Sequence, residues 1–501
     1  MFKKGKNLYI GRDYEKNIEK IKQELGESAS FDVIVREIMI AGRKGAFVGI
    51  DGLIKDDILT EIMQSIYIMK NDRVSTSSLL GYLKTNIPYI ELTSEKNIDE
   101  LLYAVLSGSI LLIVDDSEEA IIIDARTYPA RQPEEPDIER VVRGSRDGFT
   151  ETIVFNTALI RRRVRDPKLR VVLFRVGKRS KTDVCICYLE DVADPKLVDQ
   201  ITEKINSIEI DAIPMAEKAV EELIVPGSAW NPFPRVRYTE RPDVAAVHLC
   251  EGHVLIMVDT SPSVMIAPVT YFHHIQHAEE YRQNPVVGVY IRWIRYAAVI
   301  LSLIITPVWL LFALSPELLP ESLQFIGPKE TGKVPLFVQF LIAEISLDMI
   351  RMAAIHTPSP LATALGVIAA LLIGQIAIDI GLLAPEVILY TAVVAVGAFS
   401  TPSYEMAMAN RLARLFILIG TGFFQLEGFI ATTIIVFLTL AFTKSFNVPY
   451  LWPLIPLNLK ALREIIFRTP VSIQNLRPGL LNTRDVRRQP QPALKRRRQE
   501  K

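Results

Sequence analysis

Hydrophobic and polar positions divide the chain into two unlike parts. In residues 1–291, charged side chains occur throughout and short apolar runs alternate with polar ones. Residues 297–443 are mostly apolar, in runs long enough to cross the roughly 30 Å hydrocarbon layer of a bilayer as helices. The pattern therefore predicts an α/β cytosolic region of two similar subdomains followed by an all-α polytopic membrane domain.

A faint internal repeat indicates the two subdomains. Residues 35–63 and 171–201 each predict a strand, a Gly/Lys/Arg turn, a strand and a helix with an acidic start. Residues 105–124 and 249–268 each predict two strands joined by an Asp/Ser turn. The aligned pairs are Gly108 and Gly252, Asp115 and Asp259, and Ser117 and Ser261. Chance similarity between two hairpins is the alternative.

Composition and charge then set the predicted boundaries. The formal net charge of the chain is zero, but its last residues are strongly basic. The predicted segments are an N-terminal segment (1–27), subdomain 1 (28–127), a Pro-rich linker (128–149), subdomain 2 (150–290), five to six spans (291–445), and an interfacial helix with a basic tail (446–501).

The orientation in the membrane follows from the flanking charges. Arg292 and Arg295 beside the first span favour a cytoplasmic start, and the beginning of the chain lacks the apolar core of a signal peptide. Further spans are predicted over 335–356, 361–383, 385–402 and 403–444. The last holds about forty helical residues, enough for two spans, and three glycines between 420 and 428 mark a break. Because the basic tail should also stay inside, we expect six crossings.

Polar residues inside the spans are candidates for a pore or a gate. Glu344, Asp348 and Arg351 form one charged stripe that must face protein or water. The stripe fits an internal salt bridge between helices as well as it fits a gate. On the next span, Gln375 and Asp379 lie on one helical face, which indicates a wet path.

The same span carries small residues at four-residue spacing. Gly366 and Gly374 belong to this series, which lets another helix approach closely. We therefore expect this helix to take part in contacts between subunits of an oligomer.

In the soluble part, a helix that Thr150 is expected to cap presents Arg161, Arg162 and Arg163. They form either a solvated basic face or a contact with a partner domain, a subunit or lipid headgroups. His273 and His277 stand at i and i+4, which indicates a helix near the membrane surface rather than a metal site, because a third ligand at matching spacing is missing.

The remaining chemistry is sparse. Cys185 and Cys187 alternate with apolar residues in a predicted strand and are expected to be buried, reduced thiols. The sequence contains no P-loop, G-x-S-x-G or Rossmann fingerprint. We therefore predict no enzymatic activity, no cofactor, no metal site and no nucleic-acid partner.

Several long motifs resemble the A-subunit family of bacterial spore germination receptors, the GerA type. The similarity extends from about residue 100 to residue 490. The stretches that carry it are "ERVVRGSRDGFTETIVFNTALIRRRVRDPKLR", "RVRYTERPDVAAVHLCEGHVLIMVDTSPSVMIAPVTYF", "IGQIAIDIGLLAPEV", "FSTPSYEMA" and "SFNVPYLWPLIPLNLKALREIIFRTP".

The resemblance implies a role in endospore germination. It implies a protein of the spore inner membrane, surrounded by lipid, with its N-terminal domain and C-terminal tail on the cytoplasmic side. It also implies a ring-shaped homo-oligomer, a pentamer, that passes monovalent cations. The implied partners are a small membrane protein or the B and C subunits of a germination receptor.

The family pattern bears on the three arginines and on two further positions. The three arginines fall within its most recognisable stretch, which favours a subunit contact. The family often has Glu where this chain has Asp379, which keeps the charge and shortens its reach. It often has Asn where this chain has Ser403, which leaves a hydrogen-bonding role there open.

Three functions compete. A cation channel would place Gln375 and Asp379 near its path. A secondary transporter would show inverted repeats, and residues 291–443 show no such symmetry. A non-conducting scaffold or a nutrient-receptor A subunit would relay a germinant signal, with the intramembrane charges serving as structural pairs.

Overall fold

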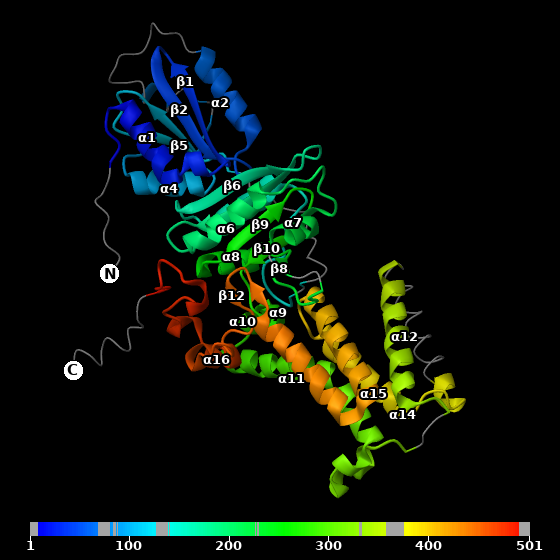
Figure 1. Cartoon of the computed structure of the whole chain (residues 1–501). Helices are drawn as coiled ribbons and strands as arrows, with labels where there is room; N and C mark the ends of the chain where they lie inside the picture. The colour runs from blue at the N-terminus through cyan, green and yellow to red at the C-terminus, as the bar shows by residue number, and fades with distance from the viewer. Residues whose placement is uncertain are drawn as a thin grey trace, which may run out of the picture.

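Two α/β subdomains stand one above the other, with a helical region below them (Figure 1). The computed structural model describes residues 9–68, 81–83, 87, 89–126, 139, 141–225, 227, 230–329, 333–356 and 375–489.

The first subdomain is a five-stranded antiparallel sheet with helices on both faces. Its strands are β1 (Val33–Ile40), β2 (Arg43–Ile50), β3 (Leu92–Glu95), β4 (Ile110–Val114) and β5 (Ala120–Ile123), in the order β1-β2-β4-β5-β3. Helices α1 (Tyr14–Leu25) and α4 (Ile98–Leu106) cover one face, and α2 (Asp56–Ile68) covers the other. A short 3₁₀ turn, η1 (Glu27–Ala29), leads from α1 into β1.

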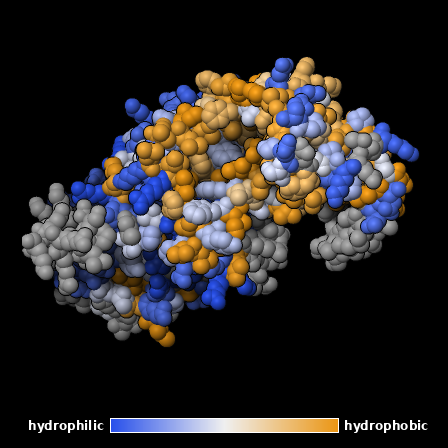
Figure 2. Space-filling view, turned by 90° about the horizontal axis from the view of Figure 1, so that it is seen from below, coloured by the Kyte–Doolittle hydropathy of each residue, from blue (hydrophilic) through white to orange (hydrophobic). Residues whose placement is uncertain are grey.

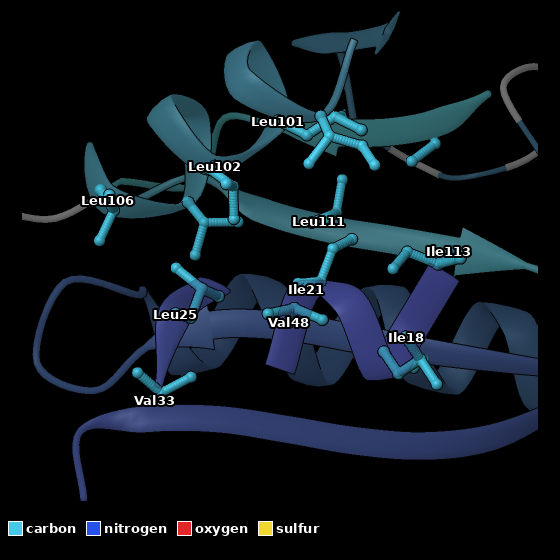
Figure 3. Packing of buried hydrophobic residues seen from close by; sticks show 14 of the residues in the cluster. Ile18, Ile21, Leu25, Val33, Val48, Leu101, Leu102, Leu106, Leu111 and Ile113 are labelled. Atoms are coloured by element: carbon cyan, nitrogen blue, oxygen red, sulfur yellow. The ribbon is translucent and has the colours of Figure 1, made fainter. Parts of the chain in front are cut away.

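Figure 3 shows the core between α1, α4 and the sheet. Ile18, Ile21 and Leu25 recur at helical spacing and point from α1 toward the sheet. Leu111 and Ile113 alternate along β4 and meet them. Helix α1 is therefore part of the first core, so the predicted boundary at residue 27 was wrong.

The second subdomain repeats this topology. Its strands are β6 (Leu169–Val176), β7 (Thr182–Leu189), β8 (Arg237–Thr239), β9 (Val254–Val258) and β10 (Val264–Ala267), in the order β6-β7-β9-β10-β8. Helices α5 (Ile153–Arg163) and α8 (Pro242–Glu251) cover one face, and α6 (Pro195–Asn206) and α7 (Ala216–Ile224) cover the other. The matching strand orders confirm that the predicted repeat is a repeat of fold.

The repeat extends to single residues. Gly108 and Gly252 follow equivalent helices and have φ angles of 98° and 107°, which favour glycine. Asn17 of α1 bonds both to the backbone N–H and to the carbonyl of Gly11, six residues earlier. Asn156 of α5 makes the same two bonds with Thr150. This asparagine pair was not predicted, and Thr150 precedes the actual N-cap of α5, Thr152.

A fully buried ion pair joins the two subdomains. The Arg161 Nε and Nη2 atoms lie 2.8 and 2.9 Å from the two carboxylate oxygens of Asp32, and Nη1 donates to the carbonyl of Leu169 at 3.1 Å. Both side chains of the pair are 0% exposed. The partner of Arg161 is therefore the neighbouring subdomain rather than another subunit, which corrects the prediction for this residue.

The other two arginines differ from Arg161. Arg163 is half-buried and donates to Asp147 at 2.6 Å and to Ser145 at 2.8 Å within the chain. Arg162 has an exposed side chain, so for this residue the subunit contact stays a prediction. Cys185 and Cys187 are buried free thiols on β7, as expected.

Below the subdomains lie the long helices α11 (Pro285–Leu314), α12 (Leu336–His356), α14 (Pro385–Phe399) and α15 (Tyr404–Phe442). Two of them, α11 and α15, are long and apolar enough to cross a membrane. Seen from below the molecule as it stands in Figure 1, the surface of the helical region is largely apolar (Figure 2). The short elements around these helices are α9 (Tyr271–Ile275), α10 (Ala278–Arg282), η3 (Pro316–Leu318), η4 (Glu321–Ile326), β11 (Lys444–Ser445), β12 (Val448–Pro449), α16 (Leu459–Ile466), η5 (Val471–Ile473) and η6 (Gly479–Leu481).

Helix α15 is a hairpin of two helices. Gln425 has the non-helical angles φ 51° and ψ −127°, and the chain folds back there. A Cβ atom on Gly428 would lie 1.9 Å from the carbonyl oxygen of Gly420, so the two arms touch where neither glycine has a side chain. The predicted break in this stretch is confirmed, at Gln425.

Both ends of the hairpin meet the second subdomain. The N–H of Ser403 donates to the carbonyl of His274, and Asn231 donates to Thr443 at 2.7 Å. After the second arm, Phe446 is 2% exposed and packs in the same core as α6 and α7. The helices and the subdomain are therefore tied together by buried side chains as well as by the chain itself.

Candidate functional site in the helical region

The helical region contains a cluster of charges, most of them buried. Glu344 of α12 is 1% exposed and accepts two bonds from Arg414 of α15, at 2.9 Å from Nε and 2.8 Å from Nη2. Arg414 also donates to the carbonyl of Ser302 on α11 at 2.7 Å. This bidentate pair therefore holds three helices together.

A second ion pair completes the cluster. Arg411 donates to the backbone carbonyl of Glu344 at 2.7 Å, and its guanidinium contacts the carboxylate of Asp348. We refer to Glu344, Asp348, Arg411 and Arg414 as the charge lock. Two carboxylates face two guanidiniums, so the charge lock is neutral as a whole, which is the condition under which buried charges are tolerated.

Arg351 lies outside the charge lock. Its Nη1 atom is 3.3 Å from the sulfur of Met408, and its guanidinium stands over the ring of Phe399 at 5.6 Å from the centroid. The stripe on α12 was predicted to form either a salt bridge between helices or a gate, and Glu344 and Asp348 pair with α15 without Arg351. The partners of Glu344 and Asp348 come from α15, on residues that the sequence pattern assigned only to a predicted span.

Gln375 and Asp379 occupy a different kind of position. Residues 375–379 are helical, and both of these side chains are exposed on the single chain. Ile376 and Ile380 beside them are also exposed, whereas Ala377 is buried against the bundle. The described part of the chain thus presents an amide and a carboxylate outward, next to apolar side chains. Gly366 and Gly374 lie outside the described residues.

Comparison with known proteins places these features in a family. The family described as Bacillus/Clostridium GerA spore germination protein matches residues 19–480. The chain belongs to the GerA family. The match covers both subdomains and the helical region, so the predicted family is confirmed.

Individual relatives cover nearly the whole of this GerA-family chain. Stage V sporulation protein AF of Bacillus subtilis (strain 168) is 46% identical over 97% of this chain and 99% of that protein. Spore germination protein KA of the same strain is 29% identical, over 98% of this chain and 92% of that protein. The "Uncharacterized membrane protein YfkQ" of that strain is 28% identical, over 94% and 91%.

One solved structure is also similar. It is the crystal structure of the N-terminal domain of the A subunit of the Bacillus megaterium spore germinant receptor GerK3. It is 27% identical, covers 53% of this chain and 99% of that chain, and has a TM-score of 0.42.

In the GerA-family protein, histidines gather where the second subdomain meets the helices. The rings of His248, His253 and His273 lie 5.1 to 5.9 Å apart, centroid to centroid. His273 is in α9 and His277 caps α10, so the predicted single helix through both was wrong. In the part of the chain that the structure describes, no group of three or more His, Cys, Asp or Glu side chains could hold a metal ion.

The buried position of His253 in this cluster predicts that the folded protein loses stability at acidic pH. Burial lowers the pKa of His253 to about 4, and its Nδ1 donates to the carbonyl of Pro268 at 2.7 Å. The unfolded chain, with a His pKa of about 6.5, therefore binds the proton more readily, so the contribution of His253 to stability is lost as the pH falls below about 6.5. At pH 5 this one group should cost about 2 kcal/mol of unfolding free energy.

The check is chemical unfolding of the full chain in detergent at pH 7.5 and pH 5. The difference in stability between the two pH values should shrink by about 2 kcal/mol in His253→Phe, because the group that titrates is gone. An unchanged difference in the variant would show that His253 does not carry the effect.

Proposed function

We propose that this protein is a membrane subunit of the spore germination apparatus and forms a homo-oligomeric channel for monovalent cations. The observation that carries the proposal is the outward-facing Asp379 on a helical segment of the apolar region. A carboxylate in contact with lipid costs about 2.5–3.5 kcal/mol on insertion scales, so it should face water or another subunit. Carboxylate and amide oxygens beside a narrow wet path replace part of a cation's hydration shell.

The charge lock has a different role in this proposal. Its carboxylates are occupied by guanidiniums, and Glu344 is buried inside one chain. Glu344 and Asp348 therefore set the relative positions of α11, α12 and α15 and do not line the path. Of the predicted pore or gate residues, Gln375 and Asp379 remain the candidates for the path.

Topology supports a cytoplasmic placement of both subdomains. Helix α11 begins beside the second subdomain, and both ends of α15 return to it. At the start of α11, Arg292 and Arg295 are both paired with the fully buried Glu280. With six crossings, the two subdomains and the C-terminal tail share the cytoplasmic side of the spore inner membrane, as the basic residues at the first span favour.

The exposed segment 375–380 also bears on the partners of the protein. The exposed face of residues 375–380 needs a covering surface, which a second copy of the chain in a ring, such as a pentamer, would supply. Several relatives are named as spore germination proteins. We therefore expect assembly with a small membrane protein or with B and C subunits of a germination receptor.

Asp379→Asn tests the proposal. The change keeps the shape and removes the charge, so K⁺ release from loaded liposomes should fall by about tenfold, the effect of roughly 1.4 kcal/mol on the barrier for the cation. Asp379→Glu should retain most of the flux. Glu321→Gln, an exposed carboxylate elsewhere in the helical region, is the matched control. Normal flux through a correctly assembled Asp379→Asn protein would exclude this carboxylate from the path.

One observation favours a second function, a non-conducting relay. Phe446 fixes the end of α15 in the core of the second subdomain. A signal received by the subdomain could thus move the helices without any ion passing through this chain. In that case Asp379→Asn and wild type would both be silent in liposomes, while germination would still require Phe446.

A further inference from the structure

A cavity of about 320 Å³ lies where three parts of the chain meet. One wall is α8 of the second subdomain, and the second is the elbow before α11, residues 271–284. The third is residues 471–489, here called the C-terminal strap. The volume is at the lower end of the range for small-molecule sites, roughly 300–1,000 Å³.

The strap is held firmly enough to form a wall. Leu480 and Leu481 are buried, and Arg477 donates to the carbonyl of Cys250 at 2.9 Å. The backbone N–H of Arg484 donates to the carbonyl of Val192 at 3.1 Å. The cavity is thus closed on one side by a segment that follows the last helix in the sequence.

The carboxylates that line the cavity are already occupied. Asp243 accepts two bonds from Arg241, at 3.1 and 2.9 Å, one from Arg282 at 2.5 Å and one from the N–H of Val244 at 3.0 Å. Glu251 accepts from Arg488 at 3.1 Å. Asp243 therefore has little acceptor capacity left for a cationic ligand.

Donors, in contrast, are in excess. Arg282 uses one nitrogen for Asp243, and Arg488 uses one for Glu251 and Gln474. The other guanidinium nitrogens of these two arginines make no hydrogen bond among the described residues. Arg237 also lines the cavity, but it is already paired with Glu139 and donates to the carbonyl of His273 at 2.9 Å. With these pairs included, four guanidiniums, of Arg237, Arg241, Arg282 and Arg488, stand against three carboxylates, of Glu139, Asp243 and Glu251.

Two histidines also line the cavity, and backbone N–H groups fix the tautomer of each ring. The Nδ1 atom of His277 accepts the N–H of Glu279 at 3.2 Å, and that of His273 accepts the N–H of Thr270 at 3.0 Å. The neutral rings must therefore carry their proton on Nε2. Burial lowers the pKa of His277 to about 4, so this ring stays neutral at pH 7. The other titratable lining groups are His248, whose Nδ1 donates to Val244, and Tyr281.

We propose that this cavity binds a small oxyanion, a carboxylate or a phosphate compound, between the elbow and the C-terminal strap. Arg282 and His277 would hold it from the elbow and Arg488 from the strap. The bound anion would add hydrogen bonds between these two segments and so fix the tail against the base of the first membrane helix. This site is separate from the cation path and does not depend on conduction.

The test is calorimetric titration of the full chain, in nanodiscs of zwitterionic phosphatidylcholine, with malonate and separately with inorganic phosphate. Chloride at the same ionic strength is the reference. We expect saturable binding of one anion per chain for at least one of the two probes. Binding should be about tenfold weaker in Arg488→Gln and in Arg282→Gln, because each removes one charge-assisted hydrogen bond.

Arg484→Gln is the control, because this strap arginine is exposed and does not line the cavity. Its affinity should match that of wild type. Hydrogen exchange of residues 471–489 should slow on addition of the binding anion, which gives a second readout if a variant folds poorly. Absence of saturable binding by either anion to folded wild-type protein, or equal weakening in Arg484→Gln, would overturn the proposal. The probe that binds identifies carboxylate or phosphate as the ligand class.

Discussion

Arg414→Ala is expected to destabilise the helical region by about 3–5 kcal/mol, because it leaves Glu344 charged, buried and without its bidentate partner. It also removes the link from α15 to the carbonyl of Ser302 on α11. Glu344→Ala should cost a similar amount, because it leaves the buried guanidinium of Arg414 without a carboxylate partner. The measurement is the unfolding of the purified protein in detergent, followed by the fluorescence of its tryptophans.

Arg351→Ala is the matched control for this prediction. Arg351 belongs to the same helical region but faces Met408 and Phe399 instead of a carboxylate, so its loss should cost about 1 kcal/mol or less. Exchanging the charges, with Glu344→Arg and Arg414→Glu together, should restore part of the stability that either change removes. Equal stability of wild type and Arg414→Ala would show that the charge lock does not hold the helices.

Arg161→Ala is expected to have a comparable effect on the soluble region, about 3–5 kcal/mol, because Asp32 would remain buried and unpaired. The loss should fall on the contact between the two subdomains, since the pair is a buried polar link between them. Arg163→Ala, which removes a half-buried arginine two residues later, should cost about 1 kcal/mol.

A double variant separates the net stabilisation by the Arg161–Asp32 pair from the cost of leaving one of its charges buried and unpaired. Arg161→Met with Asp32→Leu removes both charges and should recover most of the lost stability, because apolar replacements of a buried ion pair are often neutral or stabilising. Urea unfolding of the full chain measures all four proteins. If the double variant were as unstable as Arg161→Ala, packing and not the stranded charge would explain the loss.

The sequence predicted the features that depend on nearby residues. Turn residues such as Gly108 and Gly252 recur at equivalent positions, so the two hairpins and the repeat could be recognised locally. The break in α15 followed from length, because a helix of about forty residues is roughly twice the thickness of the hydrocarbon layer. In both cases the physical constraint acts within a short stretch of chain.

Pairings between distant residues could not be predicted in this way. Asp32 and Arg161 are 129 residues apart, and Glu344 and Arg414 are 70 residues apart. Helical spacing indicated which residues share a face but not which helix lies opposite, so Arg411 and Arg414 could not be named as the partners of Glu344 and Asp348. Helix α1 could have been assigned to the first core, since Ile18, Ile21 and Leu25 have the spacing of a buried helical face.

The proposed conduction of cations is tested most directly by the reversal potential of purified wild-type protein in planar bilayers with a KCl gradient. We expect a conductance whose reversal potential lies close to that of K⁺, and we expect this preference to be lost in Asp379→Asn. An absence of conductance above that of an empty bilayer, from protein shown to be folded and oligomeric, or a reversal potential close to that of Cl⁻, would contradict it.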